Sequence, residues 1–150
     1  VSIDRPEIEA LARLMEEGRE LADPQAQGEL RVSALRDGGR AIVATGFPFR
    51  YPELMPRQYA ILQSVLTEIA DVRRLGSASL DLCFVAANRF DGFFEMGLKP
   101  WDICAGILIA QEAGAIVTDL AGQHTMLDSG NIVAANTYLH SILLQQIAAA

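Results

Sequence analysis

The stretch that decides the fold runs from Pro100 to Gly114 and reads PWDICAGILIAQEAG. Proline fits the first turn of a helix, and the apolar residues that follow leave no wide polar face, so we expect a largely buried helix. Asp102 falls in the first turn of this helix, near free backbone N–H groups and the positive end of the helix dipole. Gly114 marks the end of the helix.

Two interpretations of Asp102 are open. The first is structural, because aspartate caps helix N-termini far more often than it binds a metal ion. The second is functional, because one carboxylate at the start of an otherwise apolar helix suits a cation such as Mg²⁺. The spacing by itself favours the cap, so the neighbouring sequence has to decide.

Four other blocks accompany this stretch. They are RRLGSASLDL at 73–82, DGFFEMG at 91–97, ATGFPF at 44–49 and SGNIVAAN at 129–136. In this order and spacing, the blocks resemble the C-terminal half of the inositol monophosphatase family, whose members are Mg²⁺-dependent phosphomonoesterases. The resemblance extends from about Gly28 to the end, and it implies a phosphorylated polyol or sugar as the substrate.

The chain departs from the family in its first half. Family members are twice as long, and their N-terminal half carries a Glu-Glu pair and an Asp-Pro-x-Asp-Gly-Thr segment that bind the metals and activate water. Neither motif occurs here in its context: Glu16-Glu17 lies in a charged helical pattern typical of a solvated face. The Asp-Gly pairs at 37–38 and 91–92 are typical of turns.

Composition places the chain among single-domain proteins with a real core. The chain has 150 residues, of which 51% are hydrophobic, and a net charge of −7. This charge and the absence of a basic run argue against nucleic acid as a partner. No leader pattern or apolar run of about 18 residues occurs, so we expect no membrane partner. Cys83 and Cys104 lie far apart among apolar neighbours, which favours reduced thiols in a cytoplasmic protein.

Hydrophobic periodicity predicts an alternation of strands and helices. We expect strands at residues 41–45, 71–75, 93–96, 115–119 and 131–134, and helices at 56–70, 77–86, 101–113 and 137–147. This pattern is typical of an α/β fold with helices packed on a layered, mixed sheet. The expected fold resembles the C-terminal domain of the inositol monophosphatase fold.

Residues 1–27 form a separate unit in this interpretation, followed by the family-like domain at 28–150. Ile8, Leu11, Ala12 and Met15 recur at helical spacing, with Glu and Arg on the other side. The segment therefore reads as an amphipathic docking helix. It could cover a face that the missing half would have covered, or pair with a second copy of the chain.

The candidate substrate site contains Gly76, Ser77, Ala78 and Glu95. The first three lie where a strand passes into a helix, an arrangement that suits an anionic or hydroxyl-rich ligand or forms a plain turn capped by Ser77. Glu95 ends a strand and is either an edge residue in water or a pocket carboxylate. The resemblance implies that residues 76–78 line the substrate pocket, that Glu95 accepts hydrogen bonds from ring hydroxyls, and that Asp102 is one metal ligand.

Other polar and aromatic residues receive structural interpretations. Arg73 and Arg74 are adjacent on a strand, so at most one of them faces a given site, and salt bridges or a subunit contact are favoured. His124 and His140 lack a metal-binding spacing and are expected on the surface or at caps. The aromatic residues are expected to be core anchors: Trp101, Phe93 and Phe94.

Two functional hypotheses remain. The first is a Mg²⁺-dependent phosphomonoesterase acting on inositol monophosphate or a related sugar phosphate, with this chain holding the recognition half of the site. Its catalytic residues would come from a complementary N-terminal half, and family members are commonly dimers. The second is a catalytically incomplete domain that serves as an oligomerisation or protein-binding module. The absent acidic motif favours the second, and the intact Glu95 and Asp102 favour the first.

Overall fold

The computed structural model describes residues 30–150. Its elements in chain order are η1 (Gly38–Arg40), β1 (Ile42–Thr45), η2 (Pro52–Leu54), α2 (Met55–Val65), β2 (Asp71–Arg73), α3 (Ala78–Ala86), β3 (Gly92–Glu95), α4 (Pro100–Glu112), β4 (Ile116–Thr118), α5 (Met126–Ser129), β5 (Ile132–Ala135) and α6 (Thr137–Ala149). The predicted amphipathic segment at 1–27 lies outside the described residues. The division of the chain at residue 27 therefore stays a prediction.

The five strands form one mixed sheet in the order β2-β1-β3-β5-β4. Strands β2, β1 and β3 are parallel, whereas β5 runs antiparallel to both β3 and β4. The long connections through α2 and α3 allow the parallel pairs, and the shorter connection from β4 to β5 produces an antiparallel pair. The predicted mixed α/β sheet is confirmed.

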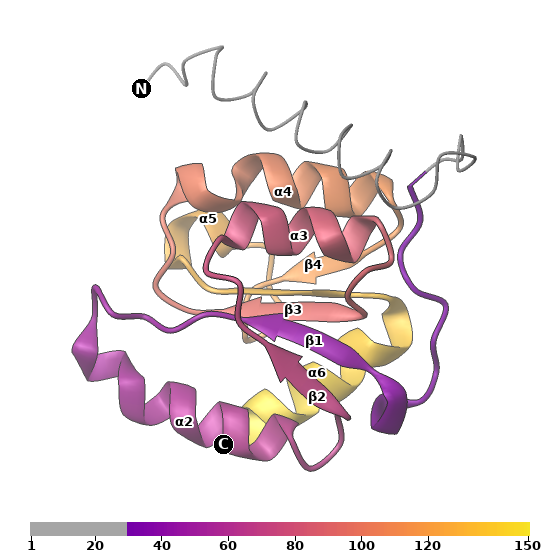
Figure 1. Cartoon of the computed structure of the whole chain (residues 1–150). Helices are drawn as coiled ribbons and strands as arrows, with labels where there is room; N and C mark the ends of the chain where they lie inside the picture. The colour runs from indigo at the N-terminus through magenta and orange to yellow at the C-terminus, as the bar shows by residue number, and fades with distance from the viewer. Residues whose placement is uncertain (1–29) are drawn as a thin grey trace.

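Helices cover both faces of the sheet and give three layers (Figure 1). Helices α3 and α4 pack together on one face, and α2 packs against α6 on the other. Each face of the sheet has its own hydrophobic core, and neighbouring residues of β3 belong to different cores. Phe93 belongs to the core under α3 and α4, and Phe94 to the core under α2 and α6, because successive strand side chains point to opposite faces. Both rings are fully buried, as predicted for core anchors.

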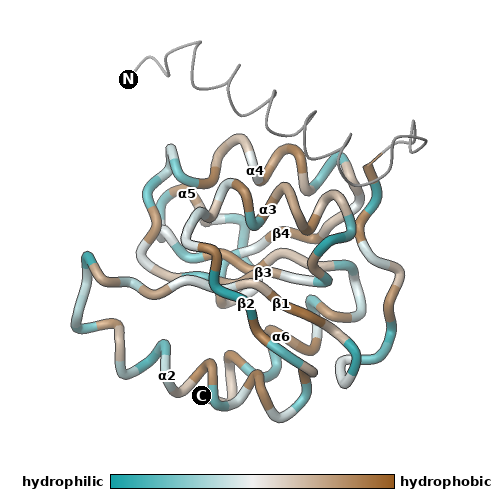
Figure 2. The backbone as a smooth tube through the Cα atoms, viewed as in Figure 1, coloured by the Kyte–Doolittle hydropathy of each residue, from teal (hydrophilic) through white to brown (hydrophobic). Residues whose placement is uncertain are grey.

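Helix α4 differs from its predicted environment. Ile103, Ile107 and Ala110 are buried against the sheet, but Leu108 is 60% exposed and Trp101 is 64% exposed. The prediction of Trp101 as a core anchor is wrong. The physical reason is that the helix rests on the sheet with one side only, and none of residues 30–150 buries these two side chains. Figure 2 shows that α3 and α4 are predominantly apolar along their length.

One other local prediction needs correction. The helix expected at 56–70 ends at Val65, because the chain turns there and brings Ile69 into the core and the backbone N–H of Ala70 to Gly38 O at 3.1 Å. The short helix α5 ends at Ser129, and Gly130 terminates it with φ 68°.

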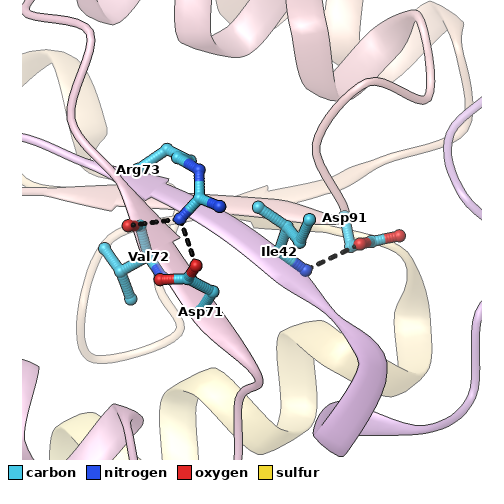
Figure 3. Close-up of polar contacts among 5 residues, drawn as sticks. All are labelled: Ile42, Asp71, Val72, Arg73 and Asp91. Atoms are coloured by element: carbon cyan, nitrogen blue, oxygen red, sulfur yellow. Dashed lines mark hydrogen bonds and ion pairs between the residues drawn. The ribbon is translucent and has the colours of Figure 1, made fainter.

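A side-chain contact ties the start of β1 to the segment before β3 (Figure 3). Asp91 lies in the bend before β3, and its Oδ2 accepts a hydrogen bond from the backbone N–H of Ile42 at 2.8 Å. On β2, Arg73 forms an ion pair with Asp71.

Within residues 30–150, no helix is both long and apolar enough to cross a membrane.

Candidate functional site

The candidate site lies at one edge of the sheet, where the three parallel strands end. Parallel strands place their carboxyl ends at the same edge, so the chain leaves β1 at Gly46, β2 at Arg74 and β3 at Glu95 in one region. Helix α3 begins shortly after β2, and α4 begins shortly after β3. Ligands of open α/β sheets typically bind at such an edge, where connections diverge to opposite faces.

Glu95 occupies the space left by Gly46. A Cβ atom on Gly46 would lie 2.1 Å from Glu95 Oε1, so only glycine leaves room for this carboxyl group. Burial raises the pKa of Glu95 to about 7, and the nearby charges of Asp81 and Asp102 act in the same direction, while Arg74 and Arg50 oppose them. Glu95 is thus a partly buried carboxylate rather than an edge residue in water, and its role in binding a substrate stays a prediction.

Asp102 has the structural role that the spacing favours. It is the third residue of α4, and its Oδ2 accepts the backbone N–H of Lys99 at 3.0 Å, as in a capping box. Arg50 Nη1 lies 3.7 Å from the same oxygen. The ammonium group of Lys99 is held by Tyr51, whose hydroxyl oxygen accepts from Nζ at 2.5 Å. The role of Asp102 as a metal ligand stays a prediction.

The Gly76–Ala78 corner leaves the start of α3 uncapped by a side chain. Gly76 has φ 92°, a backbone conformation that favours glycine. Ser77 occupies the N-cap position but makes no capping hydrogen bond, and its Oγ lies 3.3 Å from Ser79 Oγ. Ala78 is buried. The plain alternative, in which the Ser77 side chain caps the helix, is therefore not what the structure shows.

The two adjacent arginines do not share a strand as expected, because β2 ends at Arg73 and Arg74 lies just beyond it. Arg73 pairs with Asp71, which confirms the predicted salt bridge.

Arg74 lies close enough to Asp81 and Glu95 for its positive charge to lower the pKa of both. The guanidinium carbon of Arg74 lies 5.1 Å from the centroid of the Phe49 ring. Arg74 also lies close to Gly76. A Cβ atom added at residue 76 would lie 3.2 Å from Arg74 Nη1.

Sequence reasoning missed Asp81 as a component of this region. It is 1% exposed, and neither of its carboxyl oxygens has a hydrogen-bond partner in the part of the chain that the structure describes. Burial raises the pKa of Asp81 to about 6, and the positive charge of Arg74 opposes the rise. The available signal was an acid between Leu80 and Leu82 in an apolar helix, a position that apolar residues normally fill.

Comparison with known proteins relates this arrangement to one family. The family model described as the inositol monophosphatase family matches residues 13–150. The chain belongs to the inositol monophosphatase family. The Nus factor SuhB of Haemophilus influenzae is 51% identical over 118 residues, which cover 79% of this chain and 44% of that protein. The Nus factor SuhB of Escherichia coli is 51% identical over 107 residues, which cover 71% of this chain and 40% of that protein.

Solved structures of the family share the fold. The extragenic suppressor protein suhB of Bartonella henselae superposes with a TM-score of 0.77 at 38% identity, covering 81% of this chain and 47% of that one. An inositol monophosphatase from Anabaena superposes with a TM-score of 0.75 at 33% identity, and the match covers 81% of this chain and 48% of that one. The chain thus spans less than half the length of the inositol monophosphatase family members it matches.

The described residues do not by themselves fit the Mg²⁺ site that the family implies. Among residues 30–150, no group of three or more His, Cys, Asp or Glu side chains could hold a metal ion. Asp102 is a single carboxylate that already accepts a backbone N–H and faces Arg50. A small, hard cation requires several oxygen ligands, so Asp102 can contribute at most part of such a site.

The histidines lie outside the candidate site. His140, on α6, is 5% exposed, and its Nε2 lies 2.9 Å from Thr118 Oγ1. The expectation of a surface or capping role for His140 is wrong, because α6 buries this ring against β4. Burial lowers its pKa, which keeps the ring neutral. His124 is exposed, as expected.

Proposed function

We propose that this chain supplies the substrate-recognition half of a Mg²⁺-dependent phosphomonoesterase that hydrolyses inositol monophosphate or a related sugar phosphate. The observation that carries the proposal is Glu95, a partly buried carboxylate that rests on Gly46 beside the starts of α3 and α4. A partly buried carboxylate that accepts no hydrogen bond from any other described residue is suited to accept hydrogen bonds from the hydroxyl groups of a polyol.

The Gly76–Ala78 corner supports the same kind of ligand. The Ser77 side chain does not cap α3, so backbone N–H groups at the positive end of this nine-residue helix are available to a hydroxyl or phosphate oxygen. Ser77 adds a hydroxyl group that can donate or accept. Gly76, Ser77, Ala78 and Glu95 would orient the alcohol portion of the substrate, and Asp102 would supply one Mg²⁺ ligand.

The remaining catalytic groups would have to come from elsewhere. The chain spans 44% of the Haemophilus relative, and residues 30–150 hold no metal cluster. The ligands that bind Mg²⁺ and the groups that activate water would therefore be provided by a complementary N-terminal half or by a partner in a homodimer. The bacterial relatives and the sequence-based expectation of reduced thiols support a cytoplasmic location.

The first test measures binding and catalysis separately. Inositol 1-phosphate is titrated calorimetrically into the full chain with Mg²⁺ present, using the parent chain, Glu95→Gln and Glu53→Gln. Glu53 is an exposed carboxylate on η2 and serves as the matched control. We expect Glu95→Gln to weaken binding about tenfold or more, because it removes a charged hydrogen-bond acceptor worth roughly 1.5–3 kcal/mol. Equal affinity in all three proteins would contradict the proposal.

Phosphate release then tests whether the site is complete. We expect no Mg²⁺-dependent turnover of inositol 1-phosphate by the chain alone, and turnover after addition of a family N-terminal half. Asp102→Asn keeps an oxygen that can accept the hydrogen bond from the Lys99 N–H, but it removes the negative charge of the proposed metal ligand. Activity that this variant retains would therefore come from a contaminating phosphatase. Turnover by the chain alone that this substitution abolishes would show that the chain or its oligomer completes the site.

The second candidate function is a non-catalytic oligomerisation or protein-binding module. The specific observation in its favour is that the SuhB relatives are named Nus factors, while residues 30–150 lack a metal cluster. Under this alternative Glu95→Gln would leave partner binding unchanged. Substitutions of exposed apolar residues such as Trp101 would weaken it instead.

A further inference from the structure

Gln58 is a polar side chain in a place that apolar residues normally fill. It lies on α2 and is fully buried. Its Nε2 donates hydrogen bonds to Thr45 Oγ1 at 3.1 Å and to Gly46 O at 2.9 Å. Both N–H groups of the amide are therefore bound at the end of β1, where the chain enters the candidate site.

Thr45 extends this network to the neighbouring strand. Its Oγ1 donates to Phe94 O at 2.7 Å, and the two residues are paired in the parallel register of β1 and β3. Thr45 is itself 1% exposed. The hydrogen bonds thus join α2, the end of β1 and the end of β3 immediately before Glu95.

The network and Glu95 meet at Gly46 from opposite faces of the sheet. Val43 belongs to the core under α2 and α6, so Thr45, two residues further along β1, points to that face. Phe93 belongs to the core under α3 and α4, so Glu95 points to the other face, where it fills the space beside Gly46. Gly46 is therefore held through its carbonyl oxygen on one side and supports Glu95 on the other.

Folding stability gives no reason for a glutamine at this position. Gln58 Oε1 is buried, and no residue in the described range 30–150 donates a hydrogen bond to it. Burying a carbonyl oxygen without a donor costs about as much stability as the hydrogen bonds of the amide return. A methionine of similar length would fill the space without this cost. Buried polar groups that stability does not explain are found mainly where function requires them.

We propose that Gln58 is a positioning residue: with Thr45 it fixes Gly46, against which Glu95 meets the hydroxyl groups of the substrate, a role that rests on the proposed function. Gln58 does not contact the substrate itself, because α2 lies on the other side of the sheet from α3 and α4 (Figure 1). Without the network, Gly46 would move, water would reach the Glu95 carboxylate, and its oxygen atoms would leave the positions that bind the ligand.

Nuclear magnetic resonance of the full chain measures the placement of Glu95. The carboxyl carbon of Glu95, assigned by its absence in Glu95→Gln, is titrated in the parent chain, Gln58→Met and Ser64→Ala. Ser64→Ala is the matched control, because it removes a hydrogen bond from the other end of α2 to Gln146 Oε1. In Gln58→Met the pKa of Glu95 should fall from about 7 toward its usual 4.5, since water reaches the carboxylate.

The other causes of such a change are constant in this comparison. The charged residues that act on Glu95 are the same in the parent, Gln58→Met and Ser64→Ala: Asp81, Asp102, Arg74 and Arg50.

Affinity and stability separate a positioning role from a structural one. Calorimetric titration of inositol 1-phosphate, with Mg²⁺ present, should show about three- to tenfold weaker binding to Gln58→Met and unchanged binding to Ser64→Ala. The melting temperature of Gln58→Met should stay within about 4 °C of the parent. A merely structural Gln58 would give the reverse, a lower melting temperature with the pKa of Glu95 unchanged.

Thr45 provides a second pair of variants if Gln58→Met does not fold. Thr45→Val removes the hydroxyl group at nearly the same volume, so it should lower the pKa of Glu95 and weaken binding as Gln58→Met does. Thr45→Ser keeps the hydroxyl group and should restore the parent values.

Three outcomes decide the matter. A lowered pKa of Glu95 and weaker binding in Gln58→Met or Thr45→Val, with parent values in Thr45→Ser and Ser64→Ala, would support the proposal. An unchanged pKa of Glu95 in both Gln58→Met and Thr45→Val would overturn it, and so would an unchanged affinity where the parent binds the substrate. A lowered pKa in a chain whose parent form binds no inositol 1-phosphate would support the placement of Glu95 by Gln58 and contradict the proposed function.

Discussion

Asp81 and Glu95 lie in an environment that disfavours their charged forms, and burial raises the pKa of both. Asp81 is buried and has no hydrogen-bond partner among residues 30–150, and Glu95 lies against Gly46 with its pKa raised to about 7. The positive charges of Arg74 and Arg50 lower the pKa of Glu95, but they do not cancel the rise that burial causes. Unpaired buried charges cost stability, and they persist mainly at functional sites, where a ligand completes the set.

Glu95 should make the stability of the chain depend on pH. Its pKa rises from 4.5 to about 7 on folding, so the folded chain keeps a proton that the unfolded chain releases. The free energy of unfolding therefore falls as the pH rises from about 4.5 to about 7 and then levels off. Asp81 acts with the same sign at lower pH, from 3.8 to about 6.

Replacing Glu95 by glutamine should remove the part of this dependence that Glu95 causes and leave the part that Asp81 causes. At pH 8 we expect Glu95→Gln to raise the free energy of unfolding by on the order of 1–3 kcal/mol, and at pH 4.5 to leave it nearly unchanged. Urea unfolding monitored by circular dichroism at several pH values measures both. The same slope in parent and variant would refute a buried, titrating Glu95, and Glu53→Gln is the control.

At the scale of an element, α6 depends on the side chain that precedes it. Asn136 Oδ1 accepts the backbone N–H groups of Tyr138 and Leu139 at 3.0 and 2.9 Å. Its Nδ2 donates to the carbonyl oxygens of Ser33 and Leu35 at 2.7 and 2.9 Å. One residue thus caps the last helix and ties the segment before η1 to it.

Asn136→Ala should therefore destabilise the chain by about 2–3 kcal/mol, which combines a lost helix cap with two lost hydrogen bonds. Asn136→Asp keeps the cap but loses the Nδ2 donor, so its effect should be smaller than that of alanine. Urea midpoints with constant m-values would measure both changes. Equal losses in the two variants would show that the cap contributes nothing.

At the scale of the whole molecule, one sheet serves two cores. Phe93 and Phe94 are neighbours on β3, yet one packs under α3 and α4 and the other under α2 and α6. A substitution that destabilises one core should therefore also destabilise the other, because the two cores share the same strands. Such a structure is expected to unfold in one cooperative step.

Phe93→Leu and Phe94→Leu test this coupling, each with an expected loss of roughly 1–2 kcal/mol of stability. Both variants should unfold in a single transition that is the same by circular dichroism and by the fluorescence of Trp101, the one tryptophan of the chain. Two transitions, or different midpoints for the two probes in one variant, would show that the cores unfold separately.

Periodicity and local signals in the sequence determined most of the elements and the mixed α/β sheet. Apolar runs such as 41–45 and the alternating order of strands and helices are local properties, and the structure has β1 and the mixed sheet where they predict. The resemblance pointed to Gly76–Ala78, Glu95 and Asp102, which lie at the same edge of the sheet. The capping role of Asp102 was predictable because it needs only neighbours on its own helix.

Only the tertiary structure decided the environments of residues whose partners are distant in sequence. Asp81, Gly46 and Arg74 belong to the site because three parallel strands bring their ends together, and no local pattern encodes that approach. Trp101 and Leu108 are apolar and yet exposed, because the helix α4 can rest only one side on the sheet. Periodicity predicts which side chains share a helix face, whereas burial depends on what the rest of the chain places against that face.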